Sequence, residues 1–157
     1  MKRNRTLVLL VTGIVITAGA MTAVALGNTG NTTSLILAAR STLSDSIQLN
    51  DDRIKFQTKD PTDLIVQQVT FPGGGTSGWH HHPGVILVLV KSGQVIVHDA
   101  NCQTQMYGPG QAFVEHGSSP LMVSNASATD PAVDVAAQVA PQGSPFRIED
   151  DPPACAS

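Results

Sequence analysis

Short apolar and β-branched runs, separated by glycine, proline, asparagine and aspartate, fill most of the chain after residue 50. Runs of this kind between turn-forming residues predict β-strands. Strand 85–90 is wholly apolar, which predicts that both of its faces are covered. Ser92-Gly93 predicts a two-residue hairpin turn that returns the chain as the next strand. The expected strands are 53–57, 63–71, 85–90, 94–99, 112–115, 121–125 and 132–139, with residues 79–82 extended.

These short strands and their glycine and proline turns predict an all-β fold, either a β-sandwich or a β-barrel. Residues 26–34 are small and polar, as in a flexible linker. Residues 35–43 fit either a short helix or an edge strand that leads into the domain. We therefore place a linker at 26–44, one β-domain at 45–148 and a proline-rich C-terminal tail at 149–157.

The N-terminal segment has the pattern of a targeting sequence. Three basic residues, Lys2, Arg3 and Arg5, precede an apolar stretch, and Ala23-Val24-Ala25 fits a small-residue cleavage site. Residues 1–25 are therefore expected to be a signal peptide, with an uncleaved membrane anchor as the alternative. Both interpretations place the domain outside the cytoplasm, as a secreted or cell-envelope protein.

Charge excludes some classes of partner. Beyond residue 25 the chain carries six basic and twelve acidic residues, a formal charge of −6. This acidic balance disfavours nucleic acids and anionic membrane surfaces, so membrane contact is expected only through an uncleaved N-terminal segment. Phosphate-binding loops and serine-nucleophile motifs are also absent from the sequence.

The chain has two cysteines, Cys102 and Cys155. An even number of cysteines in an exported domain predicts a disulfide, which would tie the C-terminal tail to the loop after a central strand. The alternative is a pair of free thiols.

Candidate chemistry centres on the segment Trp79-His80-His81-His82. Residues two apart in an extended segment point to the same side, so His80 and His82 could hold one metal ion together. A metal site usually needs a third protein ligand. The alternative is a set of solvated loop histidines. Trp79 could form a wall of a ligand cavity or simply pack at the rim of the barrel.

Two spaced motifs resemble those of the cupin superfamily, in particular small exported bacterial cupins. The first motif has glycine, five residues, His-x-His, three or four residues, glutamate, six residues and glycine. The matching positions are Gly74, His80, His82, Ile86 and Gly93, with Ile86 in place of the glutamate. The second motif is weaker: Gly110 and Asn125 match, whereas His116, Ser118 and Leu121 replace the family's proline, glycine and histidine.

The resemblance implies a cupin-type β-barrel or jelly roll of two packed antiparallel sheets with a central cavity. It also implies a site for a divalent metal such as Zn, Fe, Mn, Ni or Cu, although Ile86 and Leu121 cannot bind one. If the hairpin at Ser92-Gly93 forms, Asp99 pairs with Ile86 and becomes the substitute third ligand. Glu115 and His116 are expected at the cavity or its rim.

Two functions remain open at this point. The favoured one is an exported binding module with a degenerate metal site, which holds a small molecule or a weakly bound metal. The alternative is a metal-dependent oxygenase or isomerase that uses His80, His82 and an unconventional third ligand. A structural role at the cell surface is a third possibility. Cupins often pair as dimers, so the resemblance leaves both a monomer and a homodimer open.

Overall fold

The computed structural model describes residues 30–156, so the predicted signal peptide lies outside the described residues. This part of the chain is all β apart from a short 3-10 turn at Ala154–Ala156, and none of its helices is long and apolar enough to cross a membrane. The strands are β1 (Thr33–Leu43), β2 (Gln48–Asp51), β3 (Ile54–Gln57), β4 (Thr62–Phe71), β5 (His80–His81), β6 (Val85–Ser92), β7 (Val95–His98), β8 (Thr104–Tyr107), β9 (Ala112–His116), β10 (Met122–Asn125), β11 (Ala132–Pro141) and β12 (Ile148–Glu149).

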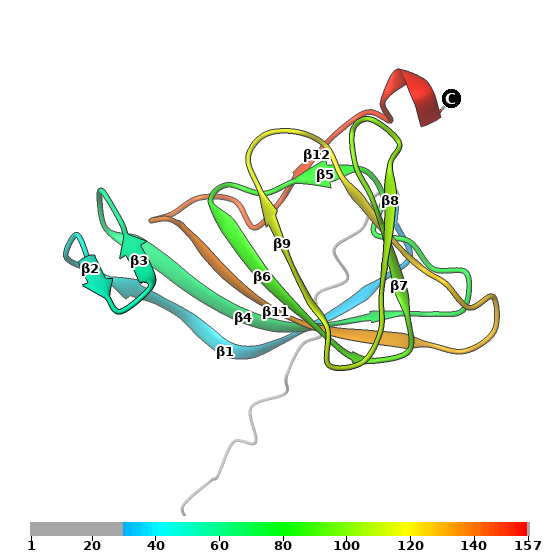
Figure 1. Cartoon of the computed structure of the whole chain (residues 1–157), viewed down its shortest axis with the longest axis horizontal. Helices are drawn as coiled ribbons and strands as arrows, with labels where there is room; N and C mark the ends of the chain where they lie inside the picture. Colours follow the sequence, from blue (N-terminus) through cyan, green and yellow to red (C-terminus); the bar gives the residue numbers. More distant parts are fainter. Residues whose placement is uncertain (1–29, 157) are drawn as a thin grey trace, which may run out of the picture.

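Two antiparallel sheets form the body of the barrel. One has the strand order β1-β4-β11-β6-β9 and the other has the order β10-β7-β8. In Figure 1 the short β5–β12 pair lies across the top of the view, whereas the β2–β3 hairpin projects at the left. The predicted all-β barrel of two packed sheets is therefore confirmed, and β2, β8 and β12 are strands that the sequence pattern did not indicate.

The barrel interior is packed from alternate residues of each strand, as the period of two requires. On β6 the inward side chains Ile86, Val88 and Val90 are at most 4% exposed. The alternating side chains Val85, Leu87 and Leu89 point outward and are 40–53% exposed. The expectation that strand 85–90 is covered on both faces is therefore wrong, because no layer of the described chain packs on this outer face.

The predicted hairpin at Ser92-Gly93 is also wrong. Strand β6 pairs with β11 on one edge and β9 on the other, so it has no free edge for β7. The chain instead bends at Gly93, where φ is +73°, and crosses into the second sheet. There β7 pairs with β8 and β10, and Val95 is completely buried.

Most of the segment expected as a linker forms β1, in agreement with the edge-strand alternative. The buried carboxylate of Asp63 on β4 holds β1 in place by accepting hydrogen bonds from Thr42 Oγ1 (2.7 Å) and Arg40 Nη1 (3.1 Å). The Gly143 amide donates a third bond of 2.9 Å. The bonds from Thr42 and Gly143, together with Arg40, hold the pKa of Asp63 below its usual range.

Candidate metal centre

His80 and His82 lie at the end of the barrel that β5 covers. Pro83 favours an extended backbone at His82, and the β5 backbone bonds to Leu121 through two hydrogen bonds of 2.9 Å with His80. The two imidazoles consequently share the inward side, with ring centroids 4.7 Å apart. Both residues are buried, at 4% and 7% exposed.

Glu115 reaches the same point from the neighbouring sheet edge. In the pairing of β6 with β9, Glu115 lies directly opposite Ile86, so both side chains point into the barrel. The Glu115 Oε2 atom lies 3.2 Å from His82 Nε2, and the carboxylate is 7% exposed. Ligand atoms of His80, His82 and Glu115 all lie within 4.8 Å of one another, close enough to hold one ion.

Hydrogen bonds fix the orientation of both imidazoles. His80 Nδ1 lies 2.9 Å from the Gly78 carbonyl, and His82 Nδ1 lies 2.9 Å from the Phe146 carbonyl. A carbonyl only accepts, so each Nδ1 carries a proton, and in the neutral imidazole each Nε2 keeps a lone pair. The neutral His82 Nε2 then faces the Glu115 carboxylate at 3.2 Å, and either a proton or a metal ion between them would pair both acceptors. This donor set fits a divalent metal ion, and the carbonyls are the partners that metal-binding histidines commonly have.

Electrostatics also favours neutral imidazole at His80. Burial, together with the nearby Arg147 and His82, lowers the pKa of His80 to about 4. The neutral imidazole is the form that coordinates a metal ion, so His80 is ready to bind at neutral pH.

A small cavity of about 60 Å³ adjoins the three ligands inside the barrel. Its wall includes the apolar side chains of Val69, Phe71 and Val88 and the polar side chains of Gln67 and Asp134. Burial, reinforced by the negative charge of Glu115, raises the pKa of Asp134 to about 7. The cavity is thus partly apolar and partly polar, and one end of it is the candidate metal centre.

Two residues expected at the site lie elsewhere. Asp99 is not a third ligand, because the strand pairing that would turn it inward does not form. Its Oδ1 atom instead accepts hydrogen bonds from the backbone amides of Asn101 (2.9 Å) and Gln103 (2.8 Å) within its own turn. His116 is exposed, because it follows the inward-pointing Glu115 and so faces outward.

The other two predicted cavity or rim residues lie close to the site. Glu115 is a member of the buried ligand group rather than a rim residue. Trp79 is 8% exposed and lies outside both the cavity wall and the hydrophobic core cluster of the barrel. Its carbonyl accepts a 3.1 Å hydrogen bond from the amide of Asp150.

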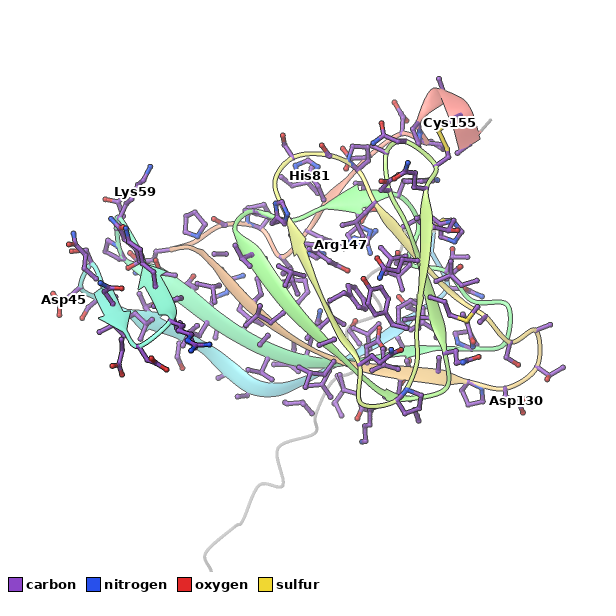
Figure 2. The ribbon with its side chains drawn as sticks, viewed as in Figure 1. Asp45, Lys59, His81, Asp130, Arg147 and Cys155 are labelled. Carbon is purple, nitrogen blue, oxygen red and sulfur yellow. A yellow bond between two sulfur atoms is a disulfide. The ribbon has the colours of Figure 1, made fainter. Side chains whose placement is uncertain are left out.

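The C-terminal tail contributes groups that sequence reasoning missed. Besides the Phe146 carbonyl, Arg147 Nη2 donates a 2.9 Å bond to the Ser77 carbonyl, and Asp150 pairs with His81 Nδ1 at 2.8 Å. Figure 2 labels His81 and Arg147 near the β5–β12 pair and Cys155 at the end of the tail. A disulfide joins Cys102 to Cys155 and anchors this tail, as the even cysteine count indicated.

Comparison with known families agrees with this geometry. Residues 67–135 match the family described as "Cupin domain". This chain carries a cupin domain. The matched segment contains His80, His82 and Glu115, and the carboxylate of this cupin domain comes from β9 rather than from position 86 on the paired strand.

Solved structures with a similar fold include several cupins. Crystal structures of DMSP lyases match at 25% identity and a TM-score of 0.48, covering 56% of this chain and 44% of theirs. A recombinant oxalate oxidase in complex with glycolate matches at 22% sequence identity with a TM-score of 0.47. The match covers 57% of this chain and 51% of the oxidase chain. A cupin superfamily protein from Desulfitobacterium hafniense matches at 11% sequence identity with a TM-score of 0.45. The match covers 64% of this chain and 79% of that protein.

This chain thus spans about half the length of the lyase and oxidase chains that it matches. With TM-scores below 0.5, these similarities identify no activity for it. No curated protein matches the chain.

Proposed function

We propose that the protein is a metal-binding cupin that holds one divalent ion through His80 Nε2, His82 Nε2 and the Glu115 carboxylate. The observation that carries this proposal is the arrangement of the three buried side chains. Their ligand atoms lie within 4.8 Å of one another, and the Nδ1 atoms of both histidines are engaged by backbone carbonyls. Imidazole and carboxylate together suit Zn, Fe, Mn, Ni or Cu.

A second candidate function is metal-dependent catalysis. Two histidines and one carboxylate on one side of an ion leave its other coordination positions open, as in non-haem iron oxygenases. The adjoining cavity of about 60 Å³ gives a small substrate access to those positions. A bound ion would act there as a Lewis acid or as a binding point for oxygen ligands. The chain's own residues would orient the ion and exclude bulk water.

Metal content tests the proposal directly. The untagged protein would be dialysed and its metal measured by elemental analysis, beside the double variant His80→Ala/His82→Ala. The control is His116→Ala, which removes an exposed histidine next to Glu115. We expect about one ion per chain in the wild type and the control and none in the double variant. Absence of metal from the wild type, or its retention in the double variant, would refute the proposal.

We also propose that the protein is exported, with residues 1–25 removed as a signal peptide. The basic start followed by an apolar stretch supports this, and the Cys102–Cys155 disulfide is typical of proteins in oxidising compartments. The mass of the protein recovered outside the cytoplasm tests the proposal. A mass that begins at residue 26 supports cleavage, whereas a full-length membrane-bound chain would indicate the anchor alternative.

A further inference from the structure

The cavity contains a second polar group that is separate from the metal ligands. Gln67 on β4 and Asp134 on β11 both line it, and they are 6% and 2% exposed. In the pairing of these strands, Gln67 lies opposite Ala136 and Asp134 lies opposite Val69. The two polar side chains are therefore diagonal neighbours on the inner face of the sheet, at a distance that one small molecule can bridge.

Both side chains present acceptors that the protein does not satisfy. Within the part of the chain that the structure describes, Gln67 Oε1 and Asp134 Oδ1 are buried and have no hydrogen-bond partner. Buried polar atoms in native proteins are almost always paired with protein, water or a ligand. Two unpaired acceptors side by side in a cavity wall therefore indicate a binding position for hydrogen-bond donors.

The charges around the cavity restrict what can bind here. Glu115 and Asp134 are both acidic, and the cation in the cavity wall is Arg147. Its guanidinium is already engaged by Glu149 at 2.7 Å and by the Ser77 carbonyl at 2.9 Å. An anionic group at the Gln67–Asp134 end would therefore meet the two unpaired oxygens and, once Asp134 is ionised, negative charge, whereas hydroxyl and amino groups would find partners.

The size of the cavity sets an upper bound on the ligand. A volume of about 60 Å³ accommodates on the order of four to six water-sized atoms. The apolar side chains of Val69, Ala136 and Val88 lie along the wall, so a short carbon backbone also fits.

We propose that Gln67 and Asp134 form a subsite for the hydroxyl or amino groups of a small diol or amino alcohol. The opposite end of this ligand faces His80, His82 and Glu115. Binding at Gln67 and Asp134 does not require the proposed metal centre. Only the contact made by the opposite end of the ligand rests on that proposal.

The test uses ethanolamine and 1,2-propanediol as probes and acetate as an anion of similar size. Saturation-transfer NMR on the full-length untagged protein would measure the affinity for each probe, both metal-free and loaded with Zn²⁺. The variants are Asp134→Asn, which keeps the size of the side chain, and Gln67→Leu. The control is Asp151→Asn, which changes an exposed carboxylate in the tail. Thermal unfolding of each variant confirms that it is folded.

We expect metal-free wild type and the Asp151 control to bind ethanolamine or propanediol in preference to acetate. Asp134→Asn and Gln67→Leu should each weaken this binding about tenfold or more, because each removes an acceptor. Their metal content should stay unchanged. Binding that both variants leave unaffected, equal binding of acetate to the metal-free protein, or no binding at all would refute the subsite and leave water as the occupant. Probe binding by a protein that takes up no Zn²⁺ in the loaded arm would instead refute the metal centre and retain the subsite.

Discussion

Removal of the disulfide is the perturbation whose effect the structure specifies most fully. The double variant Cys102→Ser/Cys155→Ser releases the tail that carries the Phe146 carbonyl and the Asp150 carboxylate. Serine is close in size to cysteine, and replacing both residues avoids leaving a free thiol. The variant therefore tests how much of the stability and of the candidate site depends on the anchored tail.

The magnitude follows from the length of the loop that the disulfide closes. The two cysteines are 53 positions apart in the sequence. In the chain-entropy model, closing a loop of that length stabilises the folded protein by about 4 kcal/mol at 25 °C. With a urea dependence of about 2 kcal/mol per molar, the unfolding midpoint should fall by about 2 M. Since small domains have only about 5–15 kcal/mol of stability, this loss is large.

Two optical probes distinguish tail release from global unfolding. The fluorescence of Trp79 reports on the tail, because the Trp79 carbonyl accepts the hydrogen bond from Asp150. Far-UV circular dichroism reports on the sheets as a whole. We expect one shared urea transition in the oxidised wild type and an earlier fluorescence transition in the double variant. Gln103→Ser, an exposed change in the same loop as Cys102, should behave as the wild type.

A clear result would refute this reasoning. If the double variant loses less than about 1 kcal/mol and its two transitions coincide, the β5–β12 pairing holds the tail without help from the disulfide. Reduction of the wild type with dithiothreitol must reproduce the behaviour of the double variant, because both remove the same covalent link.

Glu115→Gln should weaken metal binding at least tenfold. Adding Ile86→Glu should restore much of this affinity, because positions 86 and 115 lie opposite each other and both point into the barrel. Metal titration measures both effects, and a failure of Ile86→Glu to restore binding would contradict the shared orientation. Asp134→Asn should raise the free energy of unfolding of the metal-free protein by roughly 2–4 kcal/mol at pH 8, as urea unfolding would measure. Folding raises the pKa of the Asp134 carboxyl from 3.8 to about 7. The loss of stability caused by its ionisation is therefore absent below pH 4, grows between pH 4 and pH 7 and stays constant above pH 7. A stabilisation by Asp134→Asn that does not change with pH would refute this cause. Gly84→Ala should lower the free energy of unfolding by more than about 2 kcal/mol, because φ is +89° and a Cβ would overlap the Val139 carbonyl oxygen. Thermal unfolding measures the loss, and an unchanged melting temperature would show that the strands adjust to the added methyl group.

The fold and two of the three candidate ligands could be predicted from the sequence, because both depend on local patterns. Alternating runs and turn residues indicate strands, and the spacing of His80 and His82 places them on one side of an extended segment. The glutamate could not be assigned with the same certainty. Its orientation depends on β9 pairing with β6 in one register, and that pairing joins residues about 30 positions apart.

The error at Asp99 has the same origin. Ser92-Gly93 has the composition of a tight hairpin turn, but β6 already has a partner on each edge, one of which is β11 from much later in the chain. The Phe146 carbonyl was not predictable at all, since it is a backbone group 64 positions from His82 and leaves no trace in side-chain patterns. Asp134 did carry a signal, because it alternates with the inward-facing Ala132 and Ala136.

Strand β6 presents apolar side chains on both faces, and this makes its own sequence ambiguous during folding. A slip of one residue would turn Val85, Leu87 and Leu89 inward with little loss of apolar burial. The hydrophobic pattern therefore cannot set the register of this strand. The glycines at its ends can, because Gly84 and Gly93 both have positive φ and both pack against β11 so closely that a Cβ would collide with it. After such a slip, residues with side chains would occupy these two positions. The two glycines thus fix the register of a strand whose side chains would otherwise allow either face to point inward.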